Sequence, residues 1–170
     1  MFPTDDWQTA TPEDVGLDGA LVDQAMNLFG QMSGEHGMRQ AMLIRNGYVV
    51  WQGDDLDNRH LIWSCSKSFL GVCFGLLWDD GLCSPDTLVK DVWPEAEEHY
   101  PTLTIAHLGT FTGGYRGKPG GGILEPGPPM HAPGEAFCYS GQMDFQAAVL
   151  TRIAGRSLWS LFYERVGRHI

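Results

Sequence analysis

The feature that most constrains the fold is an apolar run that follows a Ser-x-x-Lys motif. The run covers residues 70–82, and Ser64 and Lys67 precede it. Because it is apolar on every side, it predicts a buried central helix with the motif at its start. Residues three apart lie on one helical face, where a serine and a lysine can share a proton. The field of the helix N-terminus favours an alkoxide on Ser64, which indicates a nucleophile activated without histidine. The structural alternative is a serine N-cap followed by a solvated lysine.

Composition and charge exclude several classes of protein. The 170 residues are 43% hydrophobic and 19% charged, which suits a single domain over residues 1–170 with a real core. A formal net charge of −10 argues against nucleic acid or an anionic membrane surface as the main partner. No apolar run reaches the length of a membrane span, and the N-terminus lacks the features of a signal peptide. We therefore expect a cytoplasmic protein.

Cysteine and histidine spacing gives no sign of a metal or another cofactor. The four cysteines show no Cys-x-x-Cys pair, and the six histidines show no metal-ligand spacing. This pattern predicts buried free thiols and a protein without a cofactor.

The N-terminal part of the chain predicts one helix and one hairpin. Asp18 can cap a helix that runs to about Met32 before a glycine-containing break at residues 33–37. Two β-rich runs, 41–45 and 48–51, flank an Asn-Gly dipeptide, which is typical of a type I′ hairpin turn. A lone hairpin is marginal in water, so this one requires further packing partners.

The C-terminal part predicts short helices separated by a long loop. Helices are expected at 104–109, capped by Thr102 or Thr104, at 143–154, and from 158 to about 166, capped by Ser157. Between the first two, residues 113–135 contain eight glycines and five prolines. Loops of this length in compact domains are typically functional lids or disordered.

Four segments of the chain together carry a family resemblance. They are the hairpin at 41–51, the motif Ser-Cys-Ser-Lys-Ser-Phe at 64–69, the segment 103–114 with Thr-Ile-Ala-His-Leu and Thr-Gly-Gly, and Pro-Gly-Glu-Ala-Phe-Cys-Tyr-Ser at 133–140. In this order they resemble the serine hydrolases of the β-lactamase and penicillin-binding superfamily, in particular its class C-like branch of esterases and D-aminopeptidases. The resemblance implies an α+β, β-lactamase/transpeptidase-like fold, with an antiparallel sheet that is flanked by helices and incomplete in this chain.

The resemblance also implies a catalytic trio. In this family a serine attacks a carbonyl to form an acyl-enzyme, while a lysine and a tyrosine exchange the proton; the matching residues are Ser64, Lys67 and Tyr139. Sequence leaves open which of the lysine and the tyrosine is the base, and a core aromatic is the structural alternative for Tyr139. We expect Trp63, Gly141 and Gln142 to line the substrate site, with Trp63 bordering the acyl pocket.

Two departures from the family pattern shape the functional hypothesis. Gly141 stands where β-lactamases and peptidases carry asparagine, which favours an esterase or amidase over a β-lactamase or D-Ala-D-Ala peptidase. The third family motif, of the Lys/His-Thr-Gly type, has no match, so we expect an N-terminal portion of a longer hydrolase. The hypothesis is a serine hydrolase of small esters or amides. The alternative is a catalytically silent domain that binds a ligand or partner, and the incomplete sheet invites pairing with another chain.

Overall fold

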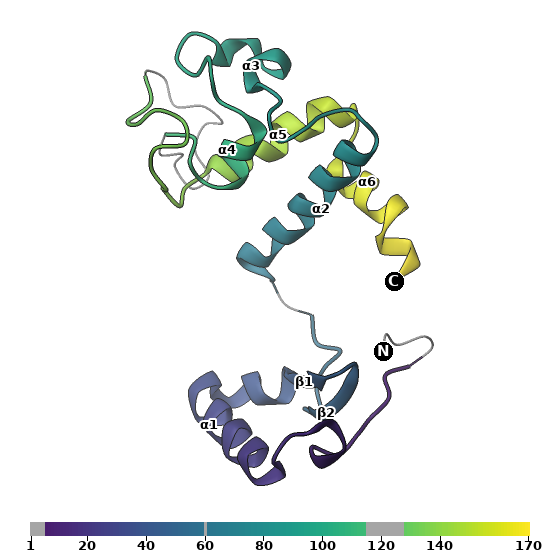
Figure 1. Cartoon of the computed structure of the whole chain (residues 1–170). Helices are drawn as coiled ribbons and strands as arrows, with labels where there is room; N and C mark the ends of the chain where they lie inside the picture. Colours follow the sequence, from purple (N-terminus) through teal and green to yellow (C-terminus); the bar gives the residue numbers. More distant parts are fainter. Residues whose placement is uncertain (1–5, 60, 115–127) are drawn as a thin grey trace. The chain divides into compact units, whose positions relative to one another are not determined.

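The computed structural model describes residues 6–59, 61–114 and 128–170, and the chain divides into two compact units (Figure 1). The units are Met1–Leu61 and Ile62–Ile170. Most of the predicted Gly/Pro-rich loop, residues 115–127, lies outside the described residues.

The first unit is built from a helix and a hairpin. After a 3₁₀ turn at Glu13–Val15, helix α1 spans Gly19–Gly37, and a second 3₁₀ turn spans Met38–Gln40. The Asp18 carboxylate caps α1 as predicted, accepting the Leu21 N–H at 3.2 Å. The predicted break at residues 33–37 is confirmed at Gly34, which has φ 75° and ψ −176° and interrupts the helix two residues after Met32. Helical backbone then resumes to Gly37, so α1 extends beyond the predicted end as a second, short helical segment after the kink.

The predicted hairpin is confirmed. Strands β1 (Met42–Arg45) and β2 (Tyr48–Gln52) pair antiparallel, with an irregularity between Leu43 and Ile44. The turn residues Asn46 and Gly47 have φ of 54° and 83°, the positive values that a type I′ turn requires. Gln8–Ala10 adds a short parallel bridge to Val49 on β2, so the described part of the chain forms a two-stranded sheet with one edge extension.

The second unit is helical, and α5 lies at its centre. Its helices are α2 (Ser66–Asp79), α3 (Val89–Val92), α4 (Ile105–Gly109), α5 (Gln142–Ala154) and α6 (Leu158–Arg165). Helix α5 packs against the other four. Its Phe145, Val149 and Leu150 are fully buried, together with Leu103 and Leu108 from the α4 region.

Helix α2 follows the Ser-x-x-Lys motif as predicted, but it differs from its prediction in burial. It begins at Ser66 and ends at Asp79, where Gly81 (φ 72°) donates to Trp78 O and Leu82 donates to Leu77 O, each at 2.9 Å. Within the helix, burial is restricted to Cys73 and Leu77. The predicted burial on every side is wrong, because α5 and α6 cover one face and leave Trp78, for example, 52% exposed.

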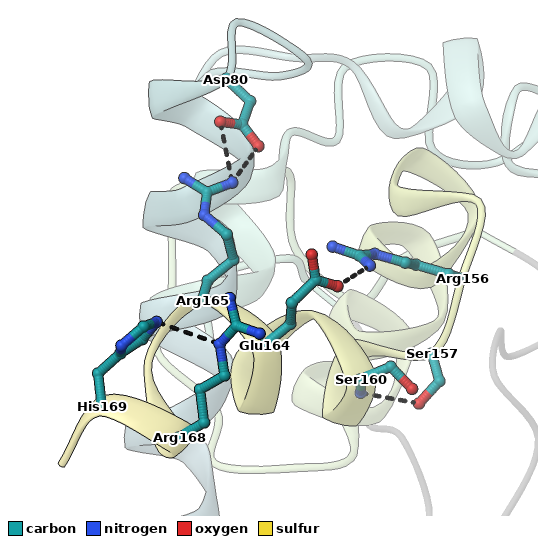
Figure 2. Close-up of polar contacts among 8 residues, drawn as sticks. All are labelled: Asp80, Arg156, Ser157, Ser160, Glu164, Arg165, Arg168 and His169. Atoms are coloured by element: carbon teal, nitrogen blue, oxygen red, sulfur yellow. Dashed lines mark hydrogen bonds and ion pairs between the residues drawn. The ribbon is translucent and has the colours of Figure 1, made fainter.

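Polar contacts fix α6 against the end of α2 (Figure 2). Ser157 caps α6 as predicted, its hydroxyl accepting the Ser160 N–H at 3.4 Å. Arg165 donates to both carboxylate oxygens of Asp80, the closer at 2.9 Å, and this contact raises the arginine pKa. Within the α6 segment, Arg156 pairs with Glu164 and lowers the pKa of that carboxyl.

All four cysteines are free thiols. Cys73 and Cys83 are buried, and burial raises the pKa of both thiols. Cys65 is exposed, contrary to the prediction of burial, because it lies in the turn ahead of α2 rather than in the helix. Across the described residues, no helix combines the length and apolarity needed to cross a bilayer.

Candidate active site

Ser64 lies in a tight turn that leads into α2. Residues Trp63–Cys65 form a 3₁₀ turn, in which the Cys65 N–H donates to Ile62 O at 3.0 Å and the Ser66 hydroxyl donates to Trp63 O at 2.7 Å. Trp63 has φ 47°, a left-handed backbone that non-glycine residues adopt uncommonly. Strained residues of this kind cluster at functional sites. The turn presents the exposed Ser64 side chain just ahead of the first residues of α2.

Lys67 contacts the Ser64 hydroxyl. Its Nζ lies 3.0 Å from Ser64 Oγ, a hydrogen bond across the three-residue spacing that the sequence predicts. Lys67 is half-buried and Ser64 is exposed, so the amine approaches from the protein side while the hydroxyl stays accessible. An ammonium has donors but no acceptor, so a charged Lys67 can only donate in this contact.

Tyr139 closes the trio from a distant part of the sequence. Its Oη lies 2.6 Å from Ser64 Oγ, and Lys67 Nζ lies 5.3 Å from the centre of its ring. The hydrogen bond with Ser64, followed by that with Lys67, lowers the pKa of the Tyr139 phenol. Tyr139 is 59% exposed, so it is not the core aromatic of the structural alternative. The structure brings the three predicted catalytic residues into mutual contact.

Phe111 packs against Tyr139. The two rings are stacked, with centroids 4.8 Å apart and an interplanar angle of 29°. The Phe111 carbonyl also accepts the N–H of Cys138, the residue before the tyrosine, at 2.8 Å. The sequence alone did not single out this residue. It lies two residues after α4, in the 103–114 segment. The family resemblance pointed to that segment but not to the phenylalanine ring within it.

The segment that carries Phe111 is held by helix α4. Thr104 caps α4, its hydroxyl accepting the His107 N–H at 3.3 Å, while His107 Nδ1 accepts the Thr104 N–H at 3.2 Å. Beyond the helix, the Thr112 N–H donates to His107 O at 2.8 Å. Thr112 O in turn accepts the Gly134 N–H at 2.8 Å, which joins this segment to the chain that leads to Tyr139.

Gln142, expected to line the substrate site, is fully buried and joins two backbone segments. Its Oε1 accepts the Gly113 N–H at 2.7 Å, and its Nε2 donates to Cys138 O at 3.2 Å. A Cβ on Gly113 would lie 2.6 Å from Gln142 Oε1, so this close approach requires glycine. These contacts assign Gln142 to positioning the segment before Tyr139 rather than to touching a substrate.

The other two expected substrate residues differ in exposure, and Gly141 is half-buried. Trp63, next to the nucleophile, is 82% exposed. Gly141 is the N-cap residue of α5, with φ −70°, and presents no side chain. A cavity of about 480 Å³ opens between α2, α4 and α5, where Lys67, Phe111 and Met143 are among its lining residues. Nowhere in the described ranges do three or more histidine, cysteine or acidic side chains gather as metal ligands would.

The fold and the site define a β-lactamase-like α+β protein with a serine at the start of a helix. The family model named Beta-lactamase matches residues 22–169, and the chain therefore belongs to the beta-lactamase family. The family and the fold class that the four sequence segments predicted are both confirmed.

Solved structures agree with this assignment of the fold. One is EstCE1, a hydrolase with promiscuous acyltransferase activity, with a TM-score of 0.60, 19% identity, and coverage of 88% of this chain and 52% of EstCE1. Another is a D-stereospecific amidohydrolase from Streptomyces sp., with a TM-score of 0.59, 18% identity, and coverage of 72% of this chain and 45% of the amidohydrolase. The chain thus spans about half the length of the structures that it matches. The search of curated proteins gave no match.

Proposed function

We propose that this chain carries the nucleophile and the proton-transfer groups of a serine hydrolase that acts on small esters or amides through an acyl-enzyme. The observation that carries the proposal is the contact of three groups around one oxygen. Ser64 Oγ lies 2.6 Å from a phenol oxygen and 3.0 Å from an amine nitrogen. A nucleophile within hydrogen-bond reach of a base, with a third group orienting the pair, is the signature of an activated nucleophile.

The hydrogen-bonding capacity of each group supports one assignment of the roles. A charged Lys67 donates to Ser64 Oγ, which leaves the serine proton free to point at Tyr139 Oη. The same contacts lower the phenol pKa, so the phenolate forms at a lower pH than for a free tyrosine. We therefore assign Tyr139 as the general base, with Lys67 as the charge that stabilises its anion.

The reaction follows in two balanced steps. Ser64 Oγ bonds to the substrate carbonyl carbon while its proton passes to the Tyr139 phenolate. The bond from that carbon to the leaving oxygen or nitrogen then breaks, and the leaving group takes the proton from Tyr139. In the second step, water gives a proton to Tyr139 while its oxygen bonds to the acyl carbon. The bond from that carbon to Ser64 Oγ then breaks, Ser64 takes the proton back from Tyr139, and the acid departs.

The family and one residue support the proposed substrate class. The solved relatives are named as a hydrolase with acyltransferase activity and as an amidohydrolase, both of which act at acyl carbonyls. Gly141 provides no side-chain amide at the position where β-lactamases and peptidases of the superfamily carry asparagine. A site without that amide favours esters and simple amides over β-lactams or D-Ala-D-Ala peptides.

The test is covalent labelling of the chain with a fluorophosphonate, read by intact mass. The wild type should gain one adduct, and Ser64→Ala should gain none. Ser66→Ala is the matched control, because it removes a second exposed hydroxyl that bonds to Trp63 O and to no member of the trio. It should still gain one adduct.

Two outcomes would overturn the proposal. An adduct that persists in Ser64→Ala would assign the reactivity to another residue. A folded wild-type chain that gains no adduct would favour the catalytically silent alternative, in which the same cleft binds a ligand or partner without turnover.

A further inference from the structure

The stacked contact between Phe111 and Tyr139 bears on function because Tyr139 is an exposed side chain whose oxygen must keep one position. The phenol is 59% exposed, and an exposed tyrosine can change rotamer on a fast timescale. Its hydrogen bond to Ser64 nevertheless requires the oxygen to stay at 2.6 Å. Phe111 supplies a flat surface at 4.8 Å, within the range of favourable aromatic pairs.

Phe111 is itself held in an uncommon backbone conformation. Its φ is 58°, in the left-handed region where a bulky residue is a genuine outlier. Glycine would adopt this conformation without strain, so the presence of a phenylalanine there needs a reason in its side chain. The ring stacks on Tyr139 and makes an edge contact with Phe137, whose ring centroid lies 6.0 Å away.

The backbone of Phe111 also contacts the segment that carries Tyr139. Its carbonyl accepts the Cys138 N–H at 2.8 Å, one residue before the tyrosine. This bond fixes where the Tyr139 main chain lies, and the ring contact acts on where the side chain points. The two contacts together restrict both the origin and the plane of the phenol.

We propose that Phe111 is a positioning residue, whose ring holds the Tyr139 phenol in the plane from which its oxygen reaches Ser64 Oγ. The inference rests on the proposed function for its catalytic consequence, but the geometry that it describes can be measured without turnover. The ring acts through Tyr139 and has no role in the chemistry itself.

The experiment measures the phenol pKa of Tyr139 and the fluorophosphonate labelling rate in a set of Phe111 variants. Tyrosine labelled with ¹³C at Cζ reports the phenol pKa by NMR, with Tyr139→Phe identifying the signal. Phe111→Gly relaxes the backbone and removes the ring, Phe111→Leu keeps apolar bulk, and Phe111→Tyr keeps the ring. Trp159→Ala is the matched control, because it removes a ring stacked on Tyr163 in α6 with an interplanar angle of 24°.

We expect Phe111→Gly and Phe111→Leu to raise the Tyr139 pKa towards the ordinary phenol value. The reason is that the Tyr139 phenol oxygen would spend less time hydrogen-bonded to Ser64 and Lys67. Labelling should slow by roughly 3- to 10-fold, the range that one aromatic contact sets. Phe111→Tyr should restore both quantities, and Trp159→Ala should leave both unchanged.

The inference fails if Phe111→Gly is folded and keeps the wild-type Tyr139 pKa, since the residue would then act only as backbone. It also fails if Phe111→Tyr behaves like Phe111→Leu. A wild-type chain that is never labelled would overturn the proposed function alone, because the NMR comparison still tests the position of the phenol. Circular dichroism and urea unfolding of each variant separate loss of fold from loss of position.

Discussion

The buried amide of Gln142 offers a prediction whose magnitude follows from the structure. Gln142→Met keeps the length of the side chain and removes its hydrogen bonds to the Gly113 N–H and to Cys138 O. The Gly113 N–H is buried and would lose its 2.7 Å acceptor, which costs about 1–3 kcal/mol for a stranded donor. Cys138 is half-buried, so its carbonyl can turn to water and adds about 1 kcal/mol or less. The better burial of methionine offsets part of this, and we expect a net loss of about 2 kcal/mol.

Urea unfolding followed by circular dichroism would measure this loss. With an m-value of about 2 kcal/mol per molar, the midpoint should fall by about 1 M urea. Gln146→Met is the matched control, one turn later on α5, where a buried amide makes a 3.3 Å bond to Ile105 O, which belongs to α4 and not to the segment before Tyr139. Fluorophosphonate labelling should slow in Gln142→Met, because the segment before Tyr139 loosens, and should keep its rate in folded Gln146→Met.

The reasoning about Gln142 would be refuted by an unfolding free energy within about 0.5 kcal/mol of the wild type, a difference typical of featureless surface substitutions. It would also be refuted if the two glutamine variants lost stability and labelling to the same extent. Either result would mean that the amide does not hold the Gly113 and Cys138 segments together.

Three further predictions concern the core, a surface ion pair and the pH dependence. Leu77→Ala, at a side chain only 1% exposed, should lower the free energy of unfolding by about 2–5 kcal/mol in the same urea assay. Asp80→Asn should lower the melting temperature slightly at low salt and not at high salt, because its contact with Arg165 is exposed and screened; an equal loss at both would contradict this. Labelling should rise with pH and level off below the ordinary phenol pKa of about 10, because the lowered pKa of Tyr139 places its phenolate there. Lys67→Met should move any remaining rise to higher pH, and a rise centred near 10 in the wild type would count against Tyr139 as the base.

Local signals allowed much of the secondary structure to be predicted. The Asp18 and Ser157 caps and the Asn-Gly turn all lie where the sequence places them. Each depends on a hydrogen bond or a backbone angle within a few residues, so the neighbouring sequence contains the information. The Ser64 to Lys67 contact belongs with them, because three-residue spacing along a helical turn is itself local.

The long-range part of the site was predictable only through a family resemblance. Tyr139 reaches Ser64 across 75 residues, and no periodicity or cap specifies that contact. The resemblance pointed to the tyrosine, but it did not reveal Phe111, whose ring matters because of where the folded chain places it. It also gave no sign that the Gln142 side chain turns inward to Gly113 and Cys138.

The sequence by itself therefore determined the helices other than α3, the hairpin and the motif that presents Ser64 beside Lys67. Only the tertiary structure decided which face of α2 is covered and which side chains surround the phenol of Tyr139. The physical reason is the range of the interactions. Caps and turns form between neighbours, whereas burial and aromatic contacts exist only after chain closure brings distant segments together.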